Sequence, residues 1–117
     1  MPHVILEHSQ PLENKVSIAE LLNLVHHTLG QQNSFDIDAV KSRAISYDHF
    51  LVTTFAQSKD FLHIQLRIME GRRPEDIQAA VAKISENVLK ILPSEVELTI
   101  EVCEMNKSLY FKKKASH

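Results

Sequence analysis

DFLHIQLRIMEGRRPEDIQAAVAKISENVLKIL, residues 60–92, decides the fold, because it changes from a strand pattern to a helix pattern near its middle. In its first ten residues apolar and polar side chains alternate with the period of two that is typical of a half-buried strand. Pro74, Glu75 and Asp76 then suit the first turn of a helix, where proline and acidic residues are favoured. The apolar positions are Leu62, Ile64, Leu66 and Ile68 in the strand, and Ile77, Val81, Ile84, Val88 and Leu92 in the helix.

The segments that follow this stretch predict a final strand. Pro93 ends the helix, and EVELTIEVCEM (95–105) alternates again, with Val96, Leu98, Ile100 and Val102 on one face. We expect SLYFKKK (108–114) to add a short edge strand.

The segments before residue 60 have the same order of strand, helix and strand. HVILEH (3–8) predicts a strand that begins almost at the N-terminus, and VSIAELLNLVHHTLG (16–30) predicts an amphipathic helix that Gly30 closes. Ser17 and Glu20 have the spacing of a capping box, which marks the start of that helix. FDIDAV (35–40) predicts a short turn or one helical turn, and KSRAISYDHFLVTTF (41–55) predicts one long strand or a bent pair.

The chain therefore has two similar halves, β-α-β followed by β-α-β, within a single domain of residues 1–117. We expect an α+β fold with a four-stranded sheet and both helices on one face, because each helix has a single apolar stripe to bury. HVILEH (3–8) and LTIEVC (98–103) carry apolar residues on both sides, which predicts that another subunit covers part of the second face.

Composition excludes several kinds of protein. A net charge of −2 gives no general attraction for nucleic acid, and the run Lys112 to Lys114 is interpreted as a solvated tail. The single Cys103 excludes an internal disulfide and fits a reducing compartment. The chain lacks a signal-peptide pattern and the roughly 18 consecutive apolar residues that a membrane span needs, so we expect a cytoplasmic protein.

Common catalytic motifs are missing as well. Seven histidines invite a metal-site interpretation, but His26 and His27 point in different directions on a helix, and His3 and His8 lie on opposite faces of a strand. No G-x-S-x-G motif is present, Cys103 is interpreted as a buried strand residue, and two glycines cannot form a phosphate-binding loop. We therefore expect neither a metal nor an organic cofactor.

Pro2 and a few cations remain as candidates for chemistry. A small residue after the initiator permits methionine removal, which would leave the secondary amine of Pro2 at the start of a strand. An α-amino group has a pKa of roughly 8, and desolvation lowers it toward the value that suits a general base at neutral pH. Lys41 and Arg43, two apart on one strand, and Arg72-Arg73 before the second helix could bind carboxylates or stabilise an enolate. The alternative is that Pro2 only begins a strand and that the cations are solvated.

Several segments together resemble the 5-carboxymethyl-2-hydroxymuconate Δ-isomerases of the tautomerase superfamily, which also includes 4-oxalocrotonate tautomerase and proteins like macrophage migration inhibitory factor. The segments are MPHVILEHS, KSRAISY, LRIMEGRRPE and LTIEVCEMNKSLYFKK, with the I-x-x-G-R turn and the closing N-x-x-x-x-F-K as the most specific parts. The resemblance covers nearly the whole chain. It implies a homotrimer with the tautomerase-like fold, a small dicarboxylate substrate, and neither metal nor cofactor.

The same resemblance implies roles for five residues. Pro2, freed by methionine removal, would transfer a proton between two positions of the substrate. Arg72 matches the arginine of the G-R turn and would bind a carboxylate or polarise a 2-oxo group, and Arg43 matches the arginine of the S-R strand. Lys41 replaces an arginine, so it keeps the charge but loses the planar fork. Phe111 matches the phenylalanine of the F-K pair and would wall the pocket from its own or a neighbouring subunit.

Three functions fit the sequence. The first is an isomerase that moves a double bond in an unsaturated 2-hydroxy or 2-oxo dicarboxylate of aromatic catabolism. The second is a non-catalytic trimer that binds a small anion in the same pocket, and retention of Met1 would favour it. The third is a tautomerase relative whose natural reaction is different, such as a decarboxylation or a hydration.

Overall fold

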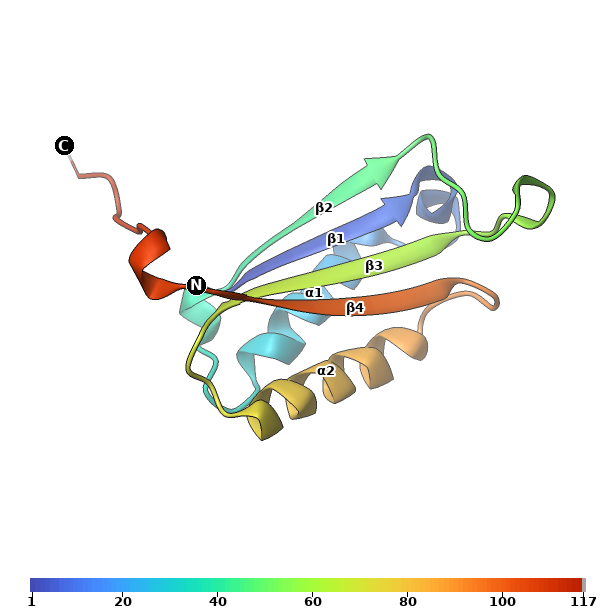
Figure 1. Cartoon of the computed structure of the whole chain (residues 1–117). Coiled ribbons are helices and arrows are strands. Elements are labelled where there is room, and N and C mark those ends of the chain that lie inside the picture. The colour runs from blue at the N-terminus through green and yellow to red at the C-terminus, as the bar shows by residue number, and fades with distance from the viewer. Residues whose placement is uncertain (117) are drawn as a thin grey trace.

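A computed structural model describes residues 1–116 as one four-stranded sheet with two helices. The main elements are β1 (His3–Ser9), α1 (Ile18–Gly30), β2 (Lys41–Tyr47), β3 (Phe61–Met69), α2 (Pro74–Leu89) and β4 (Glu97–Met105), with 3-10 turns η1 (Gln10–Asn14), η2 (Ile37–Ala39), η3 (Phe55–Gln57) and η4 (Lys107–Leu109). The strand order is β2-β1-β3-β4 (Figure 1). The predicted α+β fold is confirmed.

The two β-α-β halves meet at the centre of the sheet. Within each half the strands are parallel, β1 with β2 and β3 with β4. The halves join through the antiparallel pair β1 and β3, in which His3 lies opposite Arg67 and His8 opposite Leu62. Both helices lie on the same face of the sheet (Figure 1). Because β1 is a central strand, its first residues are flanked by two other strands.

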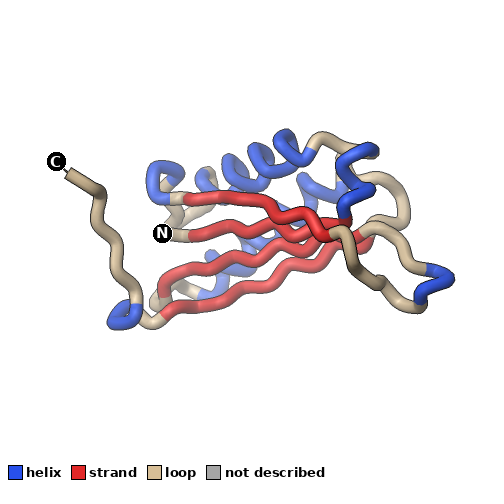
Figure 2. The backbone as a smooth tube through the Cα atoms, turned by 90° about the horizontal axis from the view of Figure 1, so that it is seen from above, coloured by secondary structure: helices blue, strands red, loops and turns tan. Residues whose placement is uncertain are grey.

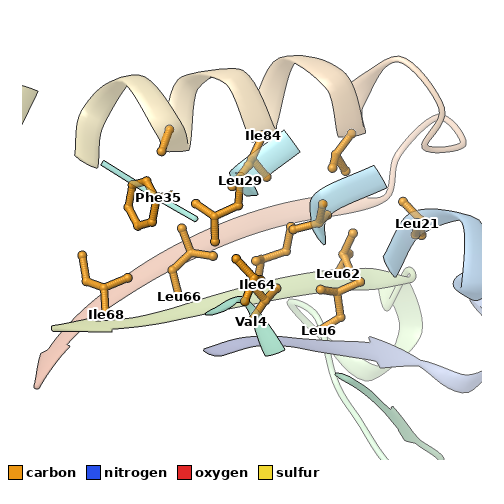
Figure 3. Close-up of a cluster of buried hydrophobic side chains, with 14 of the residues drawn as sticks. Val4, Leu6, Leu21, Leu29, Phe35, Leu62, Ile64, Leu66, Ile68 and Ile84 are labelled. Atoms are coloured by element: carbon orange, nitrogen blue, oxygen red, sulfur yellow. The ribbon is translucent and has the colours of Figure 1, made fainter. Parts of the chain in front are cut away.

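The core lies between this face and the helices, as the alternation in 60–69 predicts (Figure 3). The four alternating apolar residues that the sequence assigns to the core face of β3 are all buried, while Gln65 and Arg67 point to the other face. The hydroxyl of Ser17 accepts a hydrogen bond from the backbone N–H of Glu20 at 3.2 Å, which caps the start of α1. The core side chains labelled in Figure 3 are Val4, Leu6, Leu21, Leu29, Phe35, Leu62, Ile64, Leu66, Ile68 and Ile84.

Gly30 is the last residue of α1, and its missing side chain has a specific use. A Cβ atom at this position would lie 2.7 Å from side-chain atoms of Ile37 in η2. Glycine therefore lets the chain between α1 and β2 pass closely against the helix.

Two segments differ from the sequence predictions. The strand predicted over 41–55 ends at Tyr47, because its partner β1 ends at Ser9, directly opposite, and a longer strand would have nothing to pair with. Residues 108–114 form no strand. Asn106 caps the turn η4 instead, since its Oδ1 accepts a hydrogen bond from the N–H of Ser108 at 2.9 Å.

The second face of the sheet is open in the single chain. Figure 2 shows the four strands side by side, with one long helix beyond the edge of the sheet and the other partly behind the strands. The face mixes charged and apolar side chains, including the exposed Ile45 and Tyr47 of β2. Neither helix of the described chain is long and apolar enough to cross a membrane.

Candidate active site

The N-terminus of the chain is held at one end of the sheet. Pro2 is buried, and its carbonyl accepts a hydrogen bond from the N–H of Lys41 at 3.0 Å. The amine of Met1 donates to the carbonyl of Ala39 at 2.6 Å. The first two residues therefore continue the pairing of β1 with the chain that leads into β2.

The pKa of the terminal amine reflects the electrostatic surroundings at this end of the sheet. The pKa of the Met1 amine falls from 8.0 to about 6, first because burial disfavours its charged form and then because Lys41, Lys112 and Arg72 repel a positive charge there. These cations come from β2, the C-terminal segment and the turn after β3. Segments far apart in sequence thus converge on the N-terminus (Figure 1).

Arg72 is the most firmly placed of these cations. It follows Gly71, whose φ of +103° makes a turn that residues with side chains rarely adopt. Its Nε and Nη1 donate to the carbonyls of Ser34 and Met69, both at 3.3 Å, and its guanidinium lies 4.4 Å from the centre of the Phe35 ring. Burial lowers the pKa of this guanidinium. Nη2 makes no hydrogen bond within residues 1–116, which leaves it for a ligand.

Lys41 and Arg43 share the open face of the sheet, as their spacing predicts, and lie beside His3 and Ile5 of β1 in the strand register. Nη1 of Arg43 is 3.0 Å from Nδ1 of His3. The neighbouring Arg73, which the sequence groups with Arg72, binds Asp76 at the start of α2 instead, with Nη2 to Oδ1 at 3.1 Å. The structure therefore separates the two adjacent arginines.

The cations around the N-terminus have no carboxylate partners in the described part of the chain. All the salt bridges within residues 1–116 involve other residues. Although the chain carries a net charge of −2, this end therefore concentrates positive charge that a small anion can neutralise. The unpaired cations are Lys41, Arg43, Arg67, Arg72 and Lys112.

Phe111 lies outside this group in the single chain. Its side chain is 84% exposed and belongs to the C-terminal segment that leaves the end of the sheet (Figure 1). Its role as a pocket wall stays a prediction.

Four residues near the N-terminus were missed by the interpretation of the sequence: His3, Arg67, Tyr110 and Lys112. The strand register places His3 opposite Arg67, and Tyr110 then reaches Nε2 of His3 from the C-terminal segment. Alternation along the two strands indicates which face each residue occupies, but only pairing shows that they are neighbours. The sequence predicts that the run containing Lys112 is a solvated tail. In the structure, the positive charge of Lys112 contributes to the lowered pKa of the terminal amine.

Comparison with solved structures shows which fold this architecture has. A crystal structure of a 5-carboxymethyl-2-hydroxymuconate delta-isomerase matches with a TM-score of 0.83 at 16% identity, over 98% of this chain and 89% of that one. A 5-carboxymethyl-2-hydroxymuconate isomerase from Deinococcus radiodurans R1 matches with a TM-score of 0.70 at 22% identity, over 97% and 90%. A wild-type fused 4-OT, Q0, described as a symmetric trimer, matches with a TM-score of 0.69 at 13% identity, over 91% and 87%. The fold is that of the tautomerase superfamily.

The family model for 5-carboxymethyl-2-hydroxymuconate isomerase matches residues 2–117, and the chain belongs to this family. No curated protein matched the chain. Family membership makes the protein an isomerase of the tautomerase type, and so an enzyme. It therefore decides against the non-catalytic binding module.

Proposed function

We propose that the protein, once Met1 is removed, moves a double bond in an unsaturated 2-hydroxy or 2-oxo dicarboxylate by proton transfer, with the nitrogen of Pro2 as general base and then general acid. The observation that carries this proposal is the lowered pKa of the terminal amine, to about 6. After removal of Met1 the Pro2 nitrogen is the new terminal amine, one residue further into the same end of the sheet. Burial and the same cations act on it.

The proposed reaction is a balanced proton transfer. The Pro2 amine in its neutral form accepts the hydroxyl proton of a 2-hydroxy dienol, or a proton from a carbon conjugated with a 2-oxo group. The electron pair moves along the conjugated system, and the protonated amine returns the proton to a carbon at another position. Removal of the proton leaves negative charge on an oxygen next to the reacting carbon, which Arg72 stabilises through its unused Nη2. No electrons enter or leave, so this chemistry calls for no redox partner.

The two carboxylates of the substrate find cations on separate elements. Arg72 stands in the turn between β3 and α2, while Lys41 and Arg43 stand on β2. A charge-assisted hydrogen bond to a carboxylate is roughly twice as strong as a neutral one, so two such contacts favour a dianion over a monoanion. This preference is consistent with a substrate from aromatic catabolism, where ring opening produces unsaturated dicarboxylates.

The test is the isomerisation rate of a 2-hydroxymuconate-type dienol, followed by ultraviolet absorbance, with protein whose intact mass confirms that Met1 is absent. A positioned general base contributes roughly 10²- to 10⁴-fold, so we expect Pro2→Ala to lose at least about a hundredfold in kcat while its thermal unfolding is unchanged. A second preparation that retains Met1 has an amide at this nitrogen and is expected to be equally inactive. Full turnover by the protein that retains Met1 would show that Pro2 is not the base. Full turnover by Pro2→Ala, which keeps a primary terminal amine, would show that the ring amine of proline is not required.

We further propose that the active form is a homotrimer in which the open face of the sheet is covered by neighbouring subunits. The exposed Ile45 and Tyr47 on this face, and Leu109 and Phe111 in the C-terminal segment, are 37% to 85% exposed in the single chain. The Cα radius of gyration is 15.3 Å, against about 13 Å for a compact chain of this length, because the C-terminal segment projects outward. A neighbouring subunit would bury this segment.

The mass in solution tests the trimer. Light scattering and native mass spectrometry should give three times the 13.4 kDa of the chain. Because Ile45 lies on the open face, we expect Ile45→Glu to lower the mass toward that of a monomer. A monomeric wild-type protein would contradict the trimer without bearing on Pro2.

A further inference from the structure

His3 connects the second strand to the C-terminal segment through both nitrogens of its ring. Its Nδ1 lies 3.0 Å from Nη1 of Arg43, and its Nε2 lies 2.9 Å from the hydroxyl oxygen of Tyr110. The rings of His3 and Tyr110 meet edge to face, with centroids 5.9 Å apart. This chain of contacts joins residues that are 107 positions apart in the sequence, directly beside Pro2.

The contacts define where each hydrogen lies. A guanidinium only donates, so Nδ1 of His3 must accept from Arg43, and the ring hydrogen is on Nε2. Nε2 then donates to the oxygen of Tyr110. The phenolic hydrogen of Tyr110 is not used in this contact, and it has no acceptor within residues 1–116. Tyr110 is therefore a donor with no partner, next to a group of cations.

Tyr110 is also fixed from its own side of the chain. The turn η4 precedes it, and its backbone N–H donates to the carbonyl of Lys107 at 3.4 Å. Its side chain is half-buried, whereas those of its neighbours Leu109 and Phe111 are 85% and 84% exposed. Tyr110 is thus anchored to the sheet between two exposed residues.

We propose that Tyr110 determines the preference of this site for dicarboxylates: its hydroxyl, oriented by His3, donates a hydrogen bond to the second carboxylate of the substrate, beside Lys41 and Arg43. His3 acts through Tyr110 and is a positioning residue. The inference rests on the proposed function, and it names two residues that the proposed proton transfer itself does not require.

The arrangement requires a neutral His3, and the surroundings favour that form. Burial lowers the pKa of His3, and the positive charges of Arg43, Lys41, the terminal amine and Arg67 lower it further. Protonation at low pH places a second ring hydrogen on Nδ1, opposite the Arg43 guanidinium. The contact with Arg43 then breaks and Tyr110 loses its orientation, so dicarboxylate binding weakens as the pH falls through the pKa of His3.

Two unreactive probes separate the second carboxylate from the rest of the site. Muconate has two carboxylates, sorbate has one on the same six-carbon diene, and neither carries the 2-hydroxy group. By calorimetry on the Met1-free protein, we expect muconate to bind more tightly than sorbate. Tyr110→Phe should weaken muconate about tenfold, as for loss of one hydrogen bond to a charged group, and change sorbate less than about twofold. An equal effect on both probes, or none on muconate, would overturn the inference.

Variants of His3 test the positioning role. Glutamine offers one acceptor and one donor but does not titrate, whereas alanine offers neither. We expect His3→Ala to weaken muconate binding as Tyr110→Phe does, and His3→Gln to keep it, even at the acidic pH at which the wild type loses it. A glutamine variant as weak as the alanine variant, with both folded by circular dichroism, would contradict the role.

Failure of this inference is distinguishable from failure of the proposed function. If Pro2→Ala abolishes turnover while Tyr110→Phe binds muconate normally, the base is correct and the inference is wrong. If turnover survives in protein that retains Met1 while Tyr110→Phe loses muconate selectively, the inference is correct and the assigned base is wrong.

Discussion

The two ends of the sheet both carry buried or half-buried charge, but the charges are paired within the chain at one end and have no counter-ion at the other. At the end remote from the N-terminus, the buried carboxylate of Asp60 accepts a hydrogen bond from the hydroxyl of Ser9 at 2.8 Å and binds the ammonium group of Lys15. Ser9 in turn accepts from the N–H of Phe61 at 3.1 Å. Every polar group of this cluster has its partner in the chain itself, so the cluster joins β1 to β3 and stabilises the fold.

At the N-terminal end the cations have no such partners. Arg72 is held by backbone carbonyls and an aromatic ring, which fix its position without neutralising its charge. Lys41 and Lys112 repel a proton on the terminal amine instead of pairing with a carboxylate. The difference teaches that charges satisfied within the chain mark structure, whereas oriented charges without a counter-ion mark a ligand site, because their free energy falls only when an anion binds.

The sharpest test of this comparison replaces, one at a time, two adjacent arginines that differ in whether they form an ion pair. Arg72→Ala removes an unpaired, positioned cation, so we expect kcat/KM for the dienol to fall about a hundredfold with little change in stability, as for loss of charge-assisted hydrogen bonds. Arg73→Ala is the control, because Arg73 is exposed and already paired with Asp76. Steady-state kinetics on both variants measures the contrast. Similar losses from the two arginines would remove the distinction on which the site rests.

At the opposite end the same kind of substitution should affect stability and not activity. Asp60→Asn keeps an acceptor for Ser9 but loses the ion pair with Lys15, and we expect the free energy of unfolding to fall by about 1–2 kcal/mol. Lys59→Ala, which removes the exposed pair with Glu95, is expected to change it much less. Urea unfolding followed by circular dichroism measures both. A large loss of kcat in folded Asp60→Asn protein would show that the remote end also serves the reaction.

The smallest expected effect concerns the pH profile. In the proposed mechanism the protonated Pro2 amine is not a base, so we expect kcat/KM to fall as the pH drops through the pKa of this amine. The cations that lower the pKa of the Met1 amine are expected to act on it as well. Lys112→Met removes one of these positive charges, which favours the ammonium form and raises the pKa, so the acid limb moves to higher pH by roughly half a unit. Lys113→Met, one residue further along the run, serves as the control and should leave the limb in place. A shift with Lys113→Met but not Lys112→Met would contradict the placement of the C-terminal segment.

Most of the fold follows from local patterns. The period of two in 60–69 and the three- and four-residue spacing in 74–92 predict β3 and α2, and the structure confirms both, with Leu62, Ile64, Leu66 and Ile68 buried against the helices. The errors lie where pairing, and not pattern, decides. The segment after Tyr47 is rich in strand-forming residues but has no partner strand, because β1 has already ended.

The candidate site was predictable only in part. Pro2, Lys41, Arg43 and Arg72 could be selected from residue type and resemblance, and three cations do act on the terminal amine or on His3 beside it. Arg73 could not be separated from Arg72 in the sequence, because the difference lies in a turn with a left-handed glycine and in the nearby Asp76. The contact of His3 with Tyr110 could not be predicted, because no local pattern relates residues 107 positions apart.

The sequence by itself determined the order of the elements and the face that each buries, because these depend on neighbouring residues and on short-range sterics. It also placed a proline at position 2. Only the tertiary structure decided which cations surround that proline and which are neutralised elsewhere. Electrostatic interactions act through space, over distances set by strand register and by the path of the C-terminal segment. The cluster of positive charge near the N-terminus is therefore a property of the folded chain, and the net charge of −2 does not reveal it.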